Sequence, residues 1–415
     1  MEVIAITEIE PPVDSSTNNA LIANEGREMF KIIYPIEKVP ANLRISNEEA
    51  YTPKIISIGP YHRGGNRGIK YKHMYYTHRR FPHKIIDDKE CEIQYFYAEA
   101  TNQKYTIDMF TLDACFIIEL FLISNSESWR SDDPIFTNQF QLRSLKNDFL
   151  LLENQLPFVF IEEVFKREYG HVSSDLLDLA FDFFKEFNVL HIWPLNVKIE
   201  HFTDLLRTFQ LPPTRRLPPR SNKMVKLSFS ATQLREVGVK FEPSTSQCIL
   251  DLKFSLKRGV LRIPCLELNN TTETLMRNIL ALEQTRYRGN GYVTDYFVIL
   301  HFLIQSTEDM DLLCDCGIVV NYLFNINAAT SLVKDLFKDI KWEDMNYNYI
   351  LIYQNLNKFY HRQRSQPRIW KKILKRDYFS NPWRTASTIA AIIFLVLTFI
   401  QTVCSIMQVL QINSH

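Results

Sequence analysis

Acidic and amide side chains interrupt two of the most apolar runs of this 415-residue sequence. Glu153, Asn154 and Gln155 end the first run, and Glu283 and Gln284 end the second. A buried polar group without a hydrogen-bond partner costs about 1–3 kcal/mol, so such side chains must find partners inside the fold. The pattern favours a hydrogen-bonded polar core. A ligand-binding or catalytic pocket that uses Glu153 is the alternative.

Metal chemistry lacks a complete ligand set. His73, His78 and His83 are spaced by five residues, which does not place them on one helical face as a spacing of four would. His62 lies further upstream, and no cysteine or carboxylate pattern completes a site. We therefore predict neither a metal nor a cofactor.

The glycine-rich stretch 59–68 does not fit a phosphate-binding loop. No Lys-Ser or Lys-Thr follows it, and its glycine spacing matches neither the P-loop nor the dinucleotide fingerprint. Nucleophile-elbow, zinc-protease and kinase signatures are also missing. We predict a noncatalytic protein, and a membrane-tethered enzyme of unknown reaction that uses Glu153 or His62 is the alternative.

The elements that would position these side chains are mainly helical. Several prolines exclude long helices before Tyr61, and Lys54–Ile58 is a short strand candidate. Alternating apolar residues on either side of Arg258-Gly259 predict a β-hairpin. Helical periodicity predicts helices over residues 111–124, 138–167 with a break at Pro157, 176–187, 201–210, 232–237, 294–305, 308–314, 329–337 and 346–360. A further helix is predicted to start with Thr272 as its N-cap and to carry apolar residues as far as Leu282.

The fold class is thus mainly α (α+β), a large helical body with one β-hairpin and one C-terminal transmembrane helix. We divide the chain into a disordered tail (1–29), a globular body (30–357), a basic juxtamembrane segment (358–384), the membrane helix (385–410) and a short tail (411–415). The proline- and arginine-rich stretch 211–222 is a surface loop or a linker between lobes, because its charge makes burial expensive.

The membrane helix is predicted from residues 386–410, which carry no charge. At 1.5 Å per residue this run would reach about 37 Å, enough to cross a hydrocarbon core of about 30 Å. No secretory signal is visible at the N-terminus, so we expect a tail-anchored, single-pass membrane protein.

Its orientation follows from charge. Nine Lys or Arg residues and one acid lie between Lys358 and Arg384, and the positive-inside rule then places the body in the cytoplasm. The sequence leaves open which membrane is involved. Basic and aromatic residues expected at the membrane interface are Lys375, Arg376, Tyr378, Phe379, Trp383 and Arg384.

One face of the membrane helix is polar. Small and hydroxyl-bearing residues allow close helix approach, and glutamine can bond across an interface. Homo-oligomerisation through this face and a plain lipid-facing anchor both remain open, and an oligomeric pore is a further alternative. The polar face includes Thr398, Gln401, Thr402, Ser405 and Gln408.

Net charge and cysteine placement limit which partners and which cellular compartment are expected. With 48 basic and 47 acidic residues the net charge is +1, which gives no reason to expect nucleic acid as a partner. The seven cysteines are scattered, and Cys314 and Cys316 lack the spacing of a zinc knuckle. They are typical of packed thiols in a reducing compartment.

Seven ordered motifs resemble the plant domain of unknown function 247 family. They lie at residues 47–62, 112–120, 148–158, 231–241, 259–264, 278–284 and 376–383. The resemblance implies a plant membrane protein with one C-terminal span and no established catalytic residues, and some grass members are implicated in self-incompatibility recognition. Where relatives usually have Met-Glu-x-His-Lys, this chain has Met74-Tyr-Tyr-Thr-His78-Arg. We therefore predict recognition of an unknown protein partner at a lipid bilayer.

Overall fold

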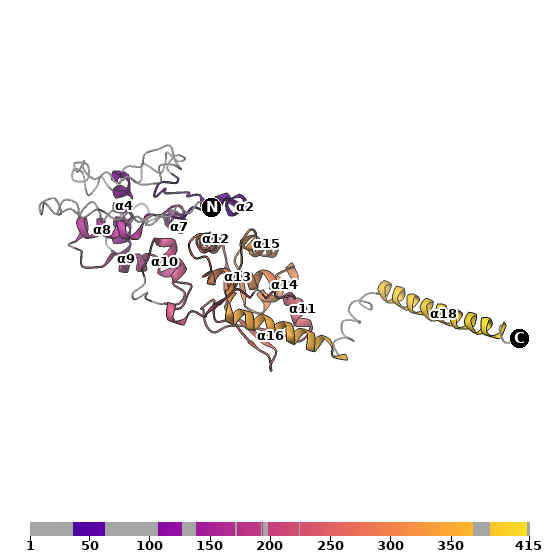
Figure 1. Ribbon diagram of the computed structural model, residues 1–415. Coiled ribbons are helices and arrows are strands. Elements are labelled where there is room, and N and C mark those ends of the chain that lie inside the picture. The colour runs from indigo at the N-terminus through magenta and orange to yellow at the C-terminus, as the bar shows by residue number, and fades with distance from the viewer. Residues whose placement is uncertain are drawn as a thin grey trace, which may run out of the picture. The chain divides into compact units, whose positions relative to one another are not determined.

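The computed structural model describes residues 36–62, 107–126, 138–170, 172–191, 193, 198–223, 225–367 and 382–412. The described chain is mainly helical, which confirms the predicted fold class (Figure 1). The described residues divide into two compact units, one drawn from the spans 36–39, 48–187 and 198–206, the other from the spans 40–47, 188–193 and 207–412. The stretch 211–222 lies inside the second unit, and the predicted tail 1–29 lies outside the described residues.

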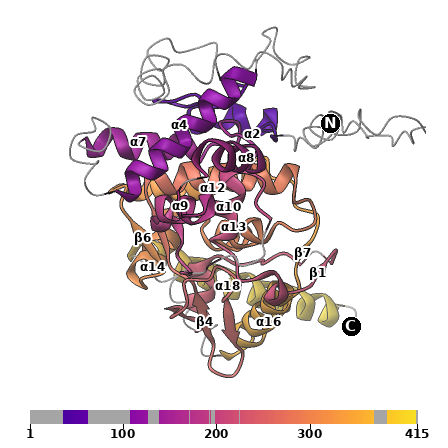
Figure 2. The ribbon, with the colours of Figure 1, turned by 90° about the vertical axis from the view of Figure 1, so that its left-hand side faces the viewer.

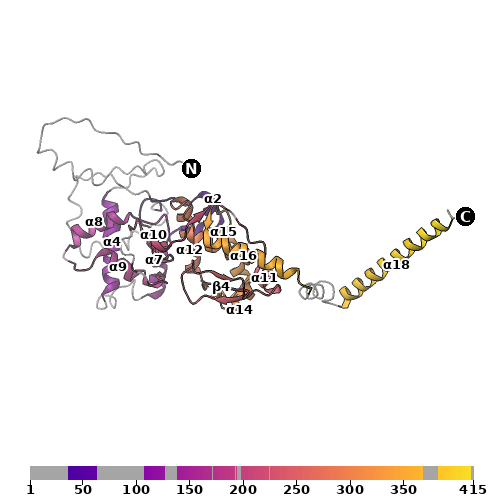
Figure 3. The ribbon, with the colours of Figure 1, turned by 60° about the horizontal axis from the view of Figure 1, so that its bottom comes forward.

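The first unit is a helical assembly in which α4 packs beside α8 and α9 (Figure 3). Its helices are η2 (Glu48–Tyr51), α4 (Ile107–Asn125), α7 (Gln139–Phe149), α8 (Phe158–Tyr169), α9 (Leu176–Phe183), η4 (Lys185–Phe187) and the start of α10 (Phe202–Thr208).

Phenylalanine rings form the core of this unit. The Phe121 ring centroid lies 4.8 Å from that of Phe183 and 5.5 Å from that of Phe202, and the Phe183 and Phe184 centroids are 5.0 Å apart. Phe149 meets Phe202 edge to face. Such offset contacts add about 0.5–1.5 kcal/mol per pair to the apolar burial, so the high phenylalanine content stabilises this unit.

The second unit combines short strands with the longer helices. Its helices are α2 (Ala41–Ser46), η5 (Thr214–Arg216), α11 (Ala231–Glu236), α12 (Asn270–Thr285), α13 (Tyr292–Leu303), α14 (Thr307–Asp315), α15 (Ile326–Phe337) and α16 (Tyr347–Arg364). Its strands are β1 (Arg220–Ser221), β2 (Lys240–Pro243), β3 (Lys253–Ser255), β4 (Val260–Ile263), β5 (Leu266–Leu268), β6 (Val319–Asn321) and β7 (Met345–Asn346).

The strands make three small sheets. The order β2-β4-β3 contains the predicted hairpin, because β3 and β4 are antiparallel with Phe254 opposite Leu261. β2 joins β4 in parallel, β5 joins β6 in parallel, and β1 joins β7 antiparallel with Arg220 opposite Asn346. The last pairing fixes the C-terminal end of the stretch 211–222 to the residue that precedes α16.

Three local predictions need correction. Lys54–Ile58 is not a strand, because side chains rather than a neighbouring strand bind its backbone amides. The break near Pro157 begins earlier, where α7 ends at Phe149. The cap of α12 is Asn269 and not Thr272, since the Asn269 side chain accepts the Thr272 amide at 2.9 Å.

The C-terminal helix α18 (Pro382–Ile412) contains the predicted span. Its segment Thr385–Met407 has a mean hydropathy of 2.5 and no part of the most apolar window is buried. The chain therefore has one C-terminal helix that is long and apolar enough to cross a membrane.

Phe324 is a conformational exception in the turn between β6 and α15. Its φ is +56°, in the left-handed region that is unfavourable for an aromatic residue, and the residue is 94% exposed. Packing of the ring therefore does not compensate for the backbone strain. We expect Phe324→Gly to raise the melting temperature of the full chain by about 2–4 °C in scanning calorimetry. Tyr322→Gly, two residues earlier at an ordinary φ, should give no gain, and an equal gain in both variants would contradict the explanation.

Candidate functional site: buried carboxylate anchors

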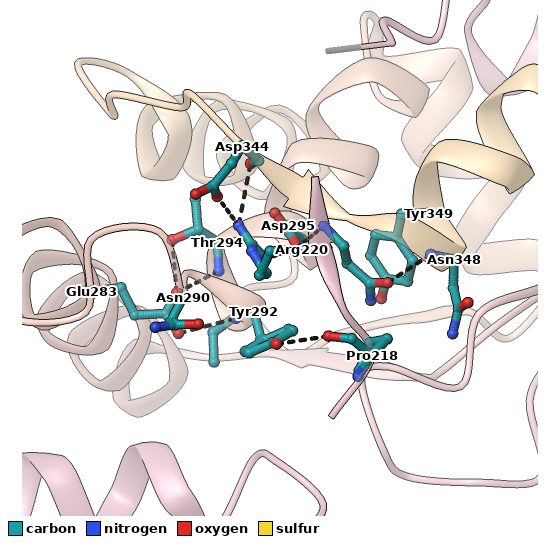
Figure 4. Close-up of polar contacts among 12 residues, drawn as sticks. Pro218, Arg220, Glu283, Asn290, Tyr292, Thr294, Asp295, Asp344, Asn348 and Tyr349 are labelled. Carbon is teal, nitrogen blue, oxygen red and sulfur yellow. Dashed lines mark hydrogen bonds and ion pairs between the residues drawn. The ribbon is translucent and has the colours of Figure 1, made fainter. Parts of the chain in front are cut away.

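Glu283 of α12 is one centre of a polar cluster in the second unit (Figure 4). Its carboxylate accepts hydrogen bonds from the Thr294 amide and hydroxyl, both at 2.8 Å, and from the Val293 amide at 3.2 Å. Arg207 Nε donates to it at 2.9 Å, and the Arg207 guanidinium lies 3.9 Å from the ring centroid of Tyr287. Glu283 therefore binds the first turn of α13 and neutralises one arginine.

Arg220 forms the second centre of this cluster (Figure 4). Its guanidinium bonds the carboxylates of Asp295 on α13 and Asp344 before β7. Asp295 is fully buried, and its second acceptor bond comes from the Asn346 amide at 2.9 Å. Tyr292 adds to the same anchor by donating its hydroxyl to the Pro218 carbonyl at 2.7 Å. These contacts fix the stretch 211–222 to α13 and to the start of α16.

Burial and neighbouring charges act on both partners of the second centre, Asp295 and Arg220. Burial raises the pKa of Asp295 to about 7, although the Arg220 charge and the Asn346 amide lower it and Glu283 raises it further. For Arg220, burial lowers the pKa, but the Asp295 and Asp344 carboxylates outweigh burial and the pKa is raised. Asp295 therefore gains or loses its proton near neutral pH, and only its deprotonated form carries a full negative charge opposite Arg220.

In the first unit, Asp148 at the end of α7 binds the backbone of residues 54–56. Its Oδ1 accepts the Lys54 amide at 2.8 Å, and its Oδ2 accepts the amides of Ile55 at 2.6 Å and Ile56 at 2.8 Å. Burial raises the pKa of Asp148 to about 6, while the three amides lower it. This carboxylate replaces the strand partner that Lys54–Ile58 lacks.

The predicted triplet lies in the same region, and all three side chains are buried. Asn154 accepts the Ile58 amide at 2.7 Å and donates to the Ile56 carbonyl at 3.1 Å. Gln155 donates to two carbonyls at the end of α7 and accepts the Phe202 amide at 2.9 Å. Asn154 and Gln155 thus serve backbone groups within their own unit.

Glu153, the third member, has a different neighbourhood. Its Oε1 accepts the Val39 amide at 2.8 Å, and its Oε2 lies 3.5 Å from His62 Nε2. Burial, with the charges of Glu153 and Glu37, raises the pKa of Tyr61 to about 12. The structure therefore brings Glu153 and His62 together, the two residues that the sequence offers for catalysis.

The remaining predicted residues do not share one site. Gln284 is half-buried and bonds the backbone of Lys341 on both its donor and acceptor sides, at 2.9 Å each. Among the described residues no three His, Cys, Asp or Glu side chains are placed to hold a metal ion. His73, His78 and His83 lie outside that part of the chain.

The predicted membrane residues are described in part. Trp383 is 84% exposed, Lys375, Arg376, Tyr378 and Phe379 lie outside the described residues, and the side chains of Arg384 and Gln408 do as well. Gln401 and Ser405 are exposed on α18. Thr398 and Thr402 donate their hydroxyls to carbonyls four residues earlier in the same helix, at 2.8 Å. Those two hydroxyl protons are therefore used within the helix and not between helices. Self-association through this face stays a prediction.

Sequence reasoning missed Arg220, Asp295 and Asp148. Arg220 belongs to a stretch whose charge argued for exposure, yet two aspartates neutralise it at a mostly buried position. Asp295 and Asp148 each lie in a helix, next to a run of apolar residues. The same pattern, an acid beside an apolar run, drew attention to Glu153. Their partners are distant in sequence, so the pattern alone could not assign them.

The described structure defines a mainly helical protein with two compact units and one apolar C-terminal helix. The chain belongs to the family described as plant protein of unknown function, domain of unknown function 247, whose pattern matches residues 36–397. It is similar to UPF0481 protein At3g47200 of Arabidopsis thaliana, at 28% identity over 439 residues, 94% of this chain and 89% of that protein. A second Arabidopsis thaliana UPF0481 protein is 26% identical over 175 residues, 41% of this chain and 32% of that protein. No solved structure matches the chain.

Proposed function

We propose that this chain is a single-pass membrane protein whose helical units face the cytoplasm and recognise a protein partner. The observation that carries the membrane assignment is α18, whose Thr385–Met407 segment has a mean hydropathy of 2.5 and is covered by no other part of the described chain. An apolar surface of this length is costly in water and stable in a bilayer. Recognition of a partner follows from the family resemblance, and the buried carboxylates Asp148, Glu283 and Asp295 bond groups of their own unit and serve the fold.

Alkaline carbonate extraction of microsomes tests the membrane assignment. We expect the full chain to stay in the membrane pellet, and Leu397→Arg combined with Ile393→Arg to release most of it, because each central arginine costs about 3 kcal/mol on insertion scales. Leu256→Arg in the exposed hairpin is the control that should remain in the pellet. Release of the unmodified chain would refute a membrane span.

Protease protection of an N-terminal tag in the same microsomes tests orientation. The excess of Lys and Arg before α18 predicts a tag that protease removes without detergent. A protected tag would place both units on the luminal side.

A tethered enzyme is the second candidate, favoured only by the pairing of Glu153 with His62. A carboxylate 3.5 Å from a partly exposed imidazole can orient a general base. Under the structural interpretation, Glu153→Gln keeps an acceptor for the Val39 amide and lowers the melting temperature by about 2–4 °C, with no other change. Hydrolysis of ester, phosphate or glycoside test substrates by the native chain, lost in Glu153→Gln at unchanged melting temperature, would favour the enzyme.

A further inference from the structure

Exposed basic side chains gather around the C-terminal half of α16. Lys358, Arg362 and Arg364 are all exposed, and residues 345–364 contain no acid. Arg364 donates to the Tyr360 hydroxyl at 3.0 Å, which holds its stem against the helix. Basic residues in a last helical turn complement the helix dipole, so α16 alone would need no further explanation.

A second basic segment is fixed to the same half of α16. Asn357 donates its side-chain amide to the Lys226 carbonyl at 3.1 Å. Three residues further along, the Phe229 ring stacks on Tyr360 with centroids 3.4 Å apart. Lys226 is exposed, and residues 223–235 contain no acid. This loop therefore adds positive charge that no helix dipole accounts for.

The β3–β4 hairpin supplies the third segment. Phe254 meets Phe359 edge to face with centroids 5.7 Å apart, and a Cβ on Gly259 would lie 2.8 Å from the Phe359 ring. The turn thus packs directly on α16. Figure 2 and Figure 3 show strand β4, which follows the turn, beside this helix. The tip residues Lys257 and Arg258 are exposed, and residues 252–263 again contain no acid.

Two acids close to these segments are paired with basic side chains. Asp251 lies 3.6 Å from Lys253, and Glu242 lies 3.0 Å from Arg262. Asp309 contacts the start of α11 but is buried, and both of its oxygens accept hydrogen bonds. In a chain of net charge +1, exposed positive charge therefore surrounds the C-terminal half of α16. This group, called the basic face below, comprises Lys226, Lys257, Arg258, Lys358, Arg362 and Arg364.

We propose that this basic face docks the second unit on anionic phospholipid headgroups of the membrane that α18 crosses. The inference rests on the proposed membrane function. Residues 365–381 join α16 to α18, and even fully extended these 17 residues reach only about 60 Å. The tether keeps the face near the headgroups, and each lysine or arginine near an anionic surface strengthens binding about fivefold. A nucleic acid would match the charge but has no such tether.

Hydrogen exchange of the full chain in lipid nanodiscs tests the docking. One set of discs contains phosphatidylcholine alone and the other contains about 30% phosphatidylserine, near the anionic content of a cytoplasmic leaflet. We expect amides of residues 256–259 and 225–228 to exchange about tenfold more slowly on the anionic discs, and about 0.5 M salt to abolish the difference. Equal exchange on both discs would overturn the inference.

Charge reversal supplies the matched comparison. Lys226→Glu, Lys257→Glu and Arg258→Glu together should remove the protection while leaving α18 and the juxtamembrane segment unchanged. Lys185→Glu, Lys338→Glu and Lys341→Glu make the same net change at exposed positions elsewhere and should keep it. If the control triple also loses protection, only net charge matters and the face is refuted. Release of the chain from microsomes on alkaline extraction would instead overturn the membrane function and this inference together.

Discussion

Replacing Asp295 with alanine is expected to lower the unfolding free energy of the second unit by about 3–5 kcal/mol, because the change leaves Arg220 buried beside a single remaining carboxylate. It also removes the acceptor for the Asn346 amide, which joins β7 to α13. Urea unfolding of the full chain in detergent, followed by fluorescence, measures the loss. Proteolysis should then cut first within residues 211–222, which the Arg220 anchor holds in place.

Asp344→Ala provides the matched control for this prediction. Asp344 bonds the same guanidinium, but its side chain is 26% exposed and Asp295 remains to neutralise the charge. We expect a loss of about 1 kcal/mol, since water can replace a partly exposed carboxylate. Equal losses in the two variants would show that burial of Asp295 is not what makes this anchor important.

The pH dependence of unfolding should report on Asp295. Because burial raises the pKa of Asp295 to about 7 from an ordinary 3.8, the folded state binds its proton more tightly than the unfolded state. This residue's contribution to stability is then greatest at low pH and is lost as pH rises from about 4 to 7, at up to about 1.4 kcal/mol per pH unit. Asp295→Asn should remove that slope. An unchanged slope would assign it to another group.

The sequence anticipated the helices better than the anchors, and the reason is physical. Helix periodicity and the hairpin alternation are local signals, so α4, α13 and the β3–β4 pair could be predicted from neighbouring residues. The role of Asp148 depends on amides 92 to 94 positions away, and that of Arg220 on Asp295, 75 positions away. A local pattern shows that a polar group is buried. It does not identify the partner.

The same distinction explains why Lys54–Ile58 looked like a strand. Its apolar residues are buried as a strand's would be, with Ile56 3% and Ile58 1% exposed. A strand would direct its amides to a neighbouring backbone, whereas here Asp148 and Asn154 accept them. Asp148 at the end of α7 and Asn154 just after it therefore take the place of a neighbouring strand. Amino-acid composition does not distinguish a strand from an extended segment that side chains bind in this way.

Asp148→Ala is therefore expected to be the most damaging single change in the first unit. It leaves three backbone amides without their acceptor, the buried Ile56 amide and the partly buried amides of Lys54 and Ile55. An unsatisfied buried group costs about 1–3 kcal/mol, and a partly buried one costs less. Allowing for relaxation and water entry, we expect a loss of about 3–5 kcal/mol in unfolding free energy. Hydrogen exchange should locate it, with the amides of residues 54–56 exchanging fastest relative to the native chain.

Two further variants make this result interpretable. Asp148→Asn keeps one acceptor oxygen but turns an NH2 group toward the remaining amides, so its loss should fall between those of the native chain and the alanine variant. Asp182→Ala on the exposed face of α9 should change stability by less than about 0.5 kcal/mol. If Asp148→Ala behaved like Asp182→Ala, the residues 54–56 would have another source of hydrogen bonds, and the carboxylate would be free for a role beyond the fold.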